Sequence, residues 1–135
     1  NIPRLKKHLD INHCDNVEVI ELALSDHEGT ARFDNQAGSG TGHLAPEGRI
    51  EVHITSLDAI SVRLPVPNVV KIDCEGAEVE VLKGGEKTIH AAKPAIFLST
   101  HGDALKQTCF SLLNSWGYVP SCLHGDDYLW VQKTT

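Results

Sequence analysis

Apolar residues along the chain fall into short runs that predict strands, separated by longer stretches with helical spacing. The run VEVIELAL, at positions 17–24, places apolar side chains on both sides of an extended backbone. A strand of this kind is typical of an α/β sheet whose faces are covered by helices. In RIEVHIT, Ile50, Val52 and Ile54 alternate with polar residues, so we expect these three to face the core. Further strands are expected at 65–73, 93–100, 118–123 and 127–133, and TARFD at 30–34 begins a hairpin.

Three stretches have the spacing of amphipathic helices: 3–12, 76–92 and 101–117. The glycine pair at 84–85 interrupts or caps the second helix. Asp103 is the expected N-cap of the third helix, because a short acidic side chain there accepts hydrogen bonds from free backbone N–H groups. The apolar stripe of this helix consists of Leu105, Cys109, Leu112 and Trp116.

Strands and helices alternate through the middle of the chain, which predicts an α/β fold with parallel core strands. The last two strands are joined by HGDD, a hairpin signal, so the sheet should end in an antiparallel pair. At 135 residues, the chain is expected to be a single domain, residues 1–135.

Composition and charge exclude several classes of function. The net charge is −6, which disfavours a nucleic acid partner. No apolar run approaches the roughly 20 residues that a membrane-spanning helix needs. The glycine-rich stretch NQAGSGTGHLAPEG lacks the lysine and following helix of a phosphate-binding loop, so we expect a flexible loop.

The four cysteines are far apart and do not have zinc-binding spacing. Their distribution favours a reducing, cytoplasmic compartment, although the even count leaves one disulfide open. The sequence contains no methionine, so we expect a fragment or a trimmed product.

Candidate chemistry gathers where two strands end. In open α/β sheets, ligands bind beyond the carboxyl ends of the strands. Asp73 follows one strand, with Lys71 on the same side and Glu75 in the turn after it, and His101 follows the next strand. Histidine can act as a general base near neutral pH. Asp73, Glu75 and His101 are therefore candidate catalytic residues.

Two further acids, Glu78 and Glu80, have a simpler interpretation. They stand in the first turn of the expected helix, where the helix dipole stabilises a carboxylate by roughly 0.3–1 kcal/mol. We expect them to have this structural role. A Mg or Mn site made of Asp73, Glu75 and His101 is a second possibility for the strand-end cluster, but the spacing does not demand it.

The segments ITSLDAI, VPNVVKIDCEGAEVEVLKGG and KPAIFLSTHG together resemble the FkbM-type methyltransferase family. That family's pattern is Thr-x-Leu-Asp, then Lys-Ile-Asp-x-Glu-Gly-x-Glu-x-x-Val-Leu-x-Gly, then a strand ending in Glu-x-His. Ser99 departs from it, because the family usually has glutamate there. The matched residues are Leu57, Asp58, Lys71, Ile72, Asp73, Glu75, Gly76, Ala77, Glu78, Val81, Leu82 and Gly84.

The resemblance implies a Rossmann-like class I methyltransferase fold with spatial strand order 3-2-1-4-5-7-6. The chain would supply strands 3–7 as the C-terminal portion of the domain, without strands 1 and 2 and without the Gly-rich segment that binds the cofactor. The two absent strands belong between strands 3 and 4. Such unpaired sheet edges favour association with other strands, including those of a second copy.

The resemblance also implies S-adenosylmethionine as the cofactor of the complete protein. By analogy with cofactor sites of this fold, the turn Ala23-Leu24-Ser25-Asp26 should approach the adenine, and Asp73 should lie near the methionine end. The expected reaction is O-methylation of a hydroxyl on a sugar, glycan or natural product, with Asp73 or His101 as base and Glu75 next. The alternative is a non-catalytic fragment or a degenerate methyltransferase-like module that cannot hold the cofactor alone.

Overall fold

The computed structural model describes residues 2–34 and 42–133, so the first half of the glycine-rich stretch, residues 35–41, lies outside the described residues. The helices are α1 (Ile2–Ile11), α2 (Leu57–Ser61), α3 (Glu78–Gly84), α4 (Glu86–Ala92) and α5 (Asp103–Ser115). The strands are β1 (Ala23–Leu24), β2 (Gly29–Asp34), β3 (His43–Leu44), β4 (Ile50–Thr55), β5 (Val69–Ile72), β6 (Ala95–Ser99), β7 (Tyr118–His124) and β8 (Asp127–Gln132). None of the described helices is long and apolar enough to cross a membrane.

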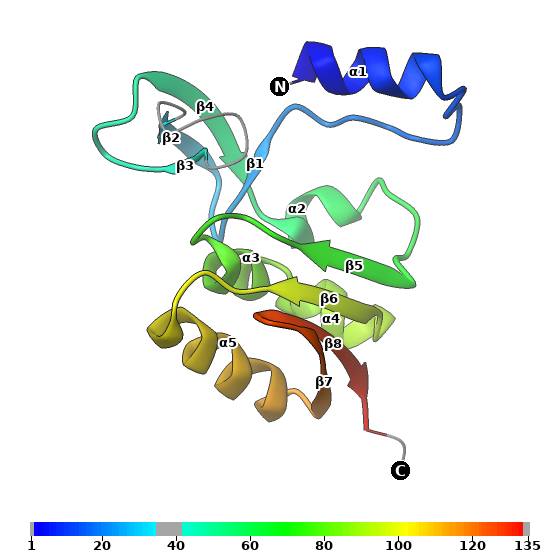
Figure 1. Ribbon diagram of the computed structural model, residues 1–135, viewed down its shortest axis with the longest axis vertical. Helices are drawn as coiled ribbons and strands as arrows, with labels where there is room; N and C mark the ends of the chain where they lie inside the picture. Colours follow the sequence, from blue (N-terminus) through cyan, green and yellow to red (C-terminus); the bar gives the residue numbers. More distant parts are fainter. Residues whose placement is uncertain (1, 35–41, 134–135) are drawn as a thin grey trace.

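The strands form two separate four-stranded sheets (Figure 1). The first has the order β1-β4-β2-β3, in which β1 pairs parallel with β4 and the other pairs are antiparallel. The second has the order β5-β6-β8-β7, with β5 parallel to β6 and an antiparallel β7–β8 hairpin. The expected α/β class and C-terminal antiparallel hairpin are confirmed. The two sheets do not join within the described residues, so β1 and β5 are both edge strands.

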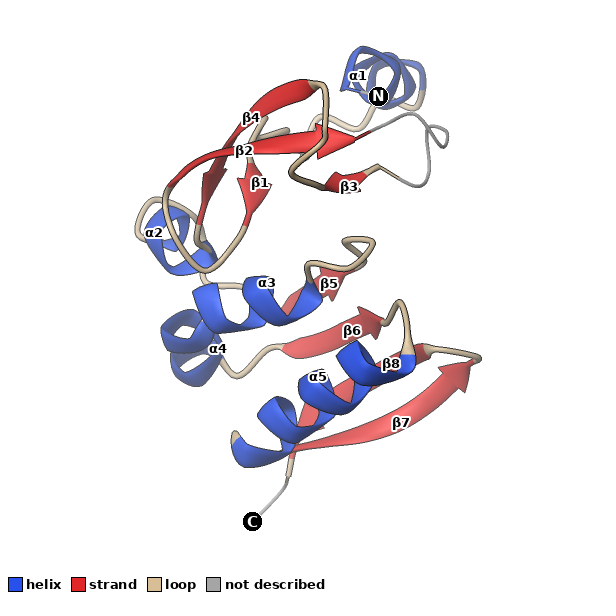
Figure 2. Cartoon of the chain, turned by 90° about the vertical axis from the view of Figure 1, so that its left-hand side faces the viewer, coloured by secondary structure: helices blue, strands red, loops and turns tan. Residues whose placement is uncertain are grey.

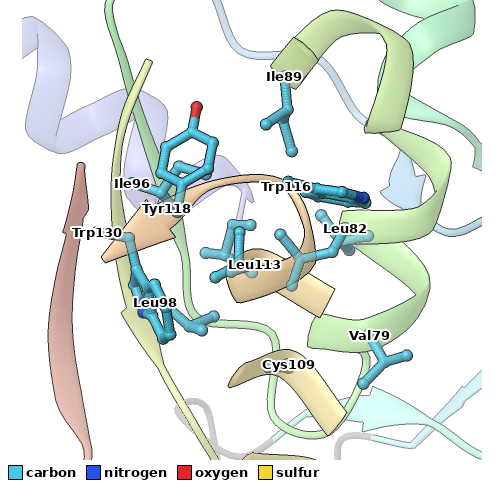
Figure 3. Close-up of a cluster of buried hydrophobic side chains, with 12 residues drawn as sticks. Val79, Leu82, Ile89, Ile96, Leu98, Cys109, Leu113, Trp116, Tyr118 and Trp130 are labelled. Carbon is cyan, nitrogen blue, oxygen red and sulfur yellow. The ribbon is translucent and has the colours of Figure 1, made fainter. Parts of the chain in front are cut away.

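The hydrophobic core lies between the second sheet and the helices α3, α4 and α5, which pack on one of its faces (Figure 2). Ile96, Leu98 and Trp130 point from the strands toward Leu82 of α3 and Leu113 of α5 (Figure 3). Burial of a large apolar side chain contributes about 1.5–3 kcal/mol, so this layer is the main source of stability. Leu113 is fully buried although the expected helix stripe omitted it.

The opposite face of this sheet carries apolar side chains that remain exposed. Alternation places Val69, Phe97, Val119 and Val131 on that face, and Val69 and Phe97 are 58% and 38% exposed. Among the described residues, helices therefore cover one face of this second sheet and leave the other open.

Several local predictions were wrong. Of the expected strand 17–24, only Ala23 and Leu24 pair with a neighbour. In β4, Ile54 is buried but Ile50 is exposed, because the first sheet has little packed against it. Asp103 is the first residue of α5 and Gly102 is the N-cap. The cysteines are not among these errors: all four are free, as their spacing favoured, and the disulfide that their even number left open does not form.

A compact joint connects α2, α3 and α4. Gly85 separates α3 from α4, as the glycine pair predicted, and has no side chain to cap α4. Asp58 of α2 provides the cap instead. Its carboxylate accepts hydrogen bonds from the backbone N–H groups of Lys87 (3.2 Å) and Thr88 (2.8 Å) and from the Thr88 hydroxyl (2.7 Å). The Leu-Asp pair of the sequence pattern is therefore explained by the packing of helices.

Substitution Asp58→Ala should lower the free energy of unfolding by about 1–2 kcal/mol, because the backbone N–H groups in the first turn of α4 would lose their hydrogen-bond acceptor and gain no new one. Urea unfolding followed by circular dichroism measures the change. Asp10→Ala, on the exposed side of α1, is the matched control and should change stability by less than about 0.5 kcal/mol. Equal effects of the two substitutions would contradict the capping role.

Substitution Gly84→Ala gives a test in which two effects have opposite signs. Alanine is favoured over glycine inside a helix by about 0.8–1 kcal/mol. A Cβ at position 84, however, would lie 2.0 Å from the backbone oxygen of Ser25. We expect the clash to dominate, so the variant should unfold at lower urea than the wild type. A more stable variant would show that the turn after β1 moves freely away from α3.

Candidate active site

Three of the predicted site residues meet at the carboxyl edge of the second sheet. Asp73 follows β5 directly, and His101 follows β6 by two residues; because the two strands are parallel, both lie at the same edge. His101 Nε2 is 3.4 Å from Glu75 Oε1 and 3.8 Å from Asp73 Oδ1. The structure therefore brings Asp73, Glu75 and His101 into one cluster, as their places after the strands predicted.

The backbone after β5 turns sharply to position Glu75. Its φ angle is 50° and that of Gly76 is 111°. The left-handed region costs a residue with a side chain roughly 1–2 kcal/mol. Other contacts must hold Glu75 in this conformation, and such strained residues are concentrated at functional sites.

Glu78, at the start of α3, supplies those contacts. Its side chain is fully buried. Oε1 accepts hydrogen bonds from the backbone N–H groups of Cys74 and Gly76, both at 3.2 Å, and lies 2.8 Å from His101 Nδ1. Glu78 thus fixes both the turn that carries Glu75 and the imidazole of His101.

Glu78 stands in the first turn of α3, as expected, but the helix dipole alone does not explain it, because the side chain is buried and has specific partners. A signal was present, since Glu78 precedes Val81 by three and Leu82 by four positions, and residues with that spacing share a helix face. Both of those residues are buried. A glutamate on the apolar face of α3 should have indicated a buried carboxylate with specific partners. Glu80, by contrast, is half-buried and lines the cavity described below.

The charges of the cluster compensate one another in part. The Lys71 ammonium lies 2.6 Å from Asp73 Oδ2, as their places on the same side of the strand allow. Partial burial would lower the pKa of His101, but the hydrogen bond to Glu78 and the charges of Glu75, Glu78 and Asp73 outweigh it. The pKa of His101 is therefore raised above its ordinary value, and the imidazole is held more firmly in its protonated form.

The predicted cofactor turn lies close to the same region. Ala23 and Leu24 form β1, and the backbone N–H of Ser25 donates to Thr55 O at 2.8 Å. Ser25 lines a cavity of about 330 Å³ with the turn at 75–77; its other lining residues are His43, Leu44 and Glu80. The structure therefore brings Ser25 and Glu75 to one cavity.

Asp26 and Asp73 do not line that cavity. Asp26 is exposed, and the hydrogen bond with His27 is the main cause of the lowered pKa of its carboxyl group. Asp73 lines a separate cavity of about 270 Å³ on the open face of the sheet, together with Lys71 and Ser99. Ser99, which replaces the glutamate of the sequence pattern, donates from its hydroxyl to Asp127 Oδ1 at 2.6 Å.

Comparison with known proteins shows a matching family and a similar fold. Residues 1–125 match the family described as the Methyltransferase FkbM domain. A hexuronic acid methyltransferase, AglP, from Haloferax volcanii is 39% identical over 69 residues, which cover 48% of this chain and 29% of that protein. The crystal structure of Methyltransferase FkbM from Methylobacillus flagellatus has a TM-score of 0.64 at 17% identity, over 96% of this chain and 32% of that chain. The chain thus spans about a third of the solved relative, and that likeness shows the fold.

Substitution Glu78→Gln should lower the pKa of His101 toward its ordinary value, because the charge that stabilises the imidazolium is removed. Titration of the imidazole by NMR measures the change. Glu75→Gln, a change at a partly exposed side chain, should lower the pKa in the same direction. Glu80→Gln should leave it unchanged and is the matched control.

The raised pKa also sets the sign of a stability effect. The folded state binds the His101 proton more tightly than the unfolded chain, so the stabilisation is complete below about pH 6.5 and is lost as pH rises through the folded-state pKa. The free energy of unfolding of wild type minus that of His101→Gln should fall across this window. A difference that rises with pH would contradict the assignment.

Proposed function

This chain belongs to the FkbM methyltransferase family, and from that premise we propose that it takes part in O-methylation of a hydroxyl group with S-adenosylmethionine as the methyl donor. The observation that carries the proposal is the cluster of Asp73, Glu75 and His101 at the carboxyl ends of β5 and β6. This is where ligands bind in open α/β sheets.

The donor region suits a cation. The cavity shared by Ser25 and Glu75 is lined by two carboxylates, those of Glu75 and Glu80. The volume of about 330 Å³ is at the lower end of the range for small-molecule sites. S-adenosylmethionine supplies an activated methyl group on a positively charged sulfur. Ser25, which lines this cavity, would approach the adenine. The other expected donor-binding residues do not line it, so Ala23, Leu24 and Asp26 would contact the donor outside the cavity, and Asp73 would lie beyond it toward the methionine end.

The catalytic contribution of this chain would be to hold the acceptor and to take its proton. A hydroxyl bound at the cluster can donate a hydrogen bond to Glu75 Oε1 or Asp73 Oδ1, the atoms that face His101 Nε2. When His101 is neutral, Nε2 can accept the hydroxyl proton as the oxygen bonds to the methyl carbon. The bond between that carbon and the donor sulfur would break in the same step, and S-adenosylhomocysteine would leave. Glu78 then stabilises the resulting imidazolium through Nδ1. Alignment of the two reactants contributes most of the rate, and the base contributes typically 10²–10⁴-fold.

The proposed acceptor class is supported by the name of one relative and by the hydrogen-bonding groups of the site. AglP is named for methylation of a hexuronic acid, and for this chain we propose a sugar, a glycan or another polyhydroxylated small molecule. Several carboxylates near the cluster can accept hydrogen bonds from adjacent hydroxyl groups. The short strand β3, with His43 and Leu44, borders the cavity and would help to select the acceptor.

We propose that residues 1–135 act as the C-terminal portion of a methyltransferase domain. Two observations support this: β1 and β5 each pair on one side, and the solved relative is about three times as long as the matched region. Two further strands between β1 and β5 would join the sheets in the order 3-2-1-4-5-7-6. The same open edges would allow association between copies of the chain.

Substitutions Asp73→Asn and His101→Ala should each reduce turnover by about 10²-fold or more in a preparation of the protein that methylates an acceptor, because each removes a group at the reacting hydroxyl. In the wild type, turnover should rise with pH as His101 loses its proton, and His101→Ala should lose that dependence. Lys6→Ala, far along the chain in α1, is the control. Unchanged turnover in both site variants would contradict the assignment.

Binding of the donor separates the proposal from a non-catalytic module. Calorimetric titration with S-adenosylmethionine and S-adenosylhomocysteine should give binding by a form of the protein with the complete domain. Binding by that form but not by residues 1–135 would support the role as a portion of the domain. Absence of binding by both would favour a degenerate module.

A further inference from the structure

We propose that Asp73, Glu75 and His101 form a binding site for a divalent metal ion. The inference goes beyond methyl transfer, and metal binding can be measured without any other ligand. With an ion bound, His101 Nε2 would be a ligand, so the proton-accepting role proposed for it above would apply to the metal-free site. Each residue offers one ligand atom, and these three atoms all lie within 4.8 Å of one another. One imidazole nitrogen and two carboxylate oxygens are a ligand set that suits Mn²⁺ and neighbouring divalent ions.

The distances from His101 Nε2 to the two carboxylates fit ligands of one shared ion better than direct hydrogen bonds. His101 Nε2 is 3.4 Å from Glu75 Oε1 and 3.8 Å from Asp73 Oδ1. A single proton on Nε2 cannot form a good hydrogen bond to both, since such bonds are about 2.7–3.2 Å long. Ligands about 2.1 Å from one ion are separated by about 3.0 Å at a right angle and by up to about 4.2 Å across it. The two observed separations lie within that range.

Glu78 gives an independent reason to expect an ion at this place. Metal-binding histidines usually donate their other ring N–H to a carboxylate, which fixes the tautomer and the ring orientation. Here the fully buried Glu78 accepts at 2.8 Å on the Nδ1 side. Nε2 is thereby directed at Asp73 and Glu75. Glu78 Oε2 is also buried and has no hydrogen-bond partner among the described residues. Burying a carboxylate oxygen without a partner lowers the stability of the fold.

The charge balance points the same way. Asp73, Glu75 and Glu78 carry three negative charges, and Lys71 neutralises one of them through Asp73 Oδ2. Asp73 Oδ1, on the side of His101, remains available. With neutral His101, the cluster has a net charge of about −2, which one divalent ion would neutralise. Protonated His101 alone would neutralise half of it, and this is the alternative that the experiment must distinguish.

The experiment is titration of the whole chain with Mn²⁺ alone, followed by calorimetry and by EPR. One Mn²⁺ should bind per chain, and pulsed EPR should detect coupling to an imidazole nitrogen. His101→Ala and Glu75→Gln should each weaken binding at least 10-fold. Glu78→Gln should weaken it about 10–100-fold, the usual effect of losing the group that orients a ligand.

Glu86→Gln is the matched control, because it removes an exposed carboxylate in the first turn of α4 and leaves the three ligands in place. Its affinity for Mn²⁺ should equal that of the wild type. His101→Ala changes a side chain that is one third exposed, and circular dichroism will confirm that it folds. No binding at millimolar Mn²⁺, binding unchanged in His101→Ala, or absence of the nitrogen coupling would each overturn the proposal.

Discussion

The carboxylate of Glu78 connects the parts of the molecule on which the site depends. It lies in the core layer, yet its Oε1 atom has three polar partners: the backbone N–H groups of Cys74 and Gly76 and the imidazole of His101. These partners come from the turn after β5 and from the segment after β6. A buried charge is tolerated when hydrogen bonds compensate for its lost hydration. The geometry of the strand ends and the burial of Glu78 therefore require each other.

This constraint explains why the turn can hold an unfavourable backbone. Glu75 has a φ of 50°, a conformation that glycine would adopt at lower cost. The two N–H groups flanking it are both bound to the same oxygen, which prevents the turn from relaxing. The hydrogen bonds to Glu78 offset the cost of the strained backbone. As a result, the Glu75 carboxylate faces His101 as well as the solvent. The left-handed backbone at position 75 thus directs the carboxylate toward His101, whereas a right-handed helical turn would direct it elsewhere.

Much of the fold could be predicted because local patterns decide it. Periodicity located α1, α5 and the strands β4 to β8, and the glycine pair located the break between α3 and α4. The strand-end rule brought Asp73 and His101 together, since it depends only on two adjacent parallel strands. The buried role of Glu78 was not predicted, because its charge was given more weight than its position on the apolar face of the helix. Asp58 was recognised as part of a sequence pattern, but its partners Lys87 and Thr88 are about thirty residues away, and such pairings cannot be deduced from local spacing.

The first sheet shows why the strand 17–24 was predicted at the wrong length. Its apolar side chains have high strand propensity, but propensity produces a strand only where a neighbour offers backbone hydrogen bonds. Ala23 and Leu24 find that neighbour in β4, whereas residues 17–22 have no strand partner among the described residues. The outer edge of β5 also has no strand partner among the described residues, and Val69 of this strand is exposed. Apolar strands with one unpaired edge are suited to pairing with further strands, so the sequence pattern of 17–24 is better explained by partners beyond the two sheets than by either sheet alone.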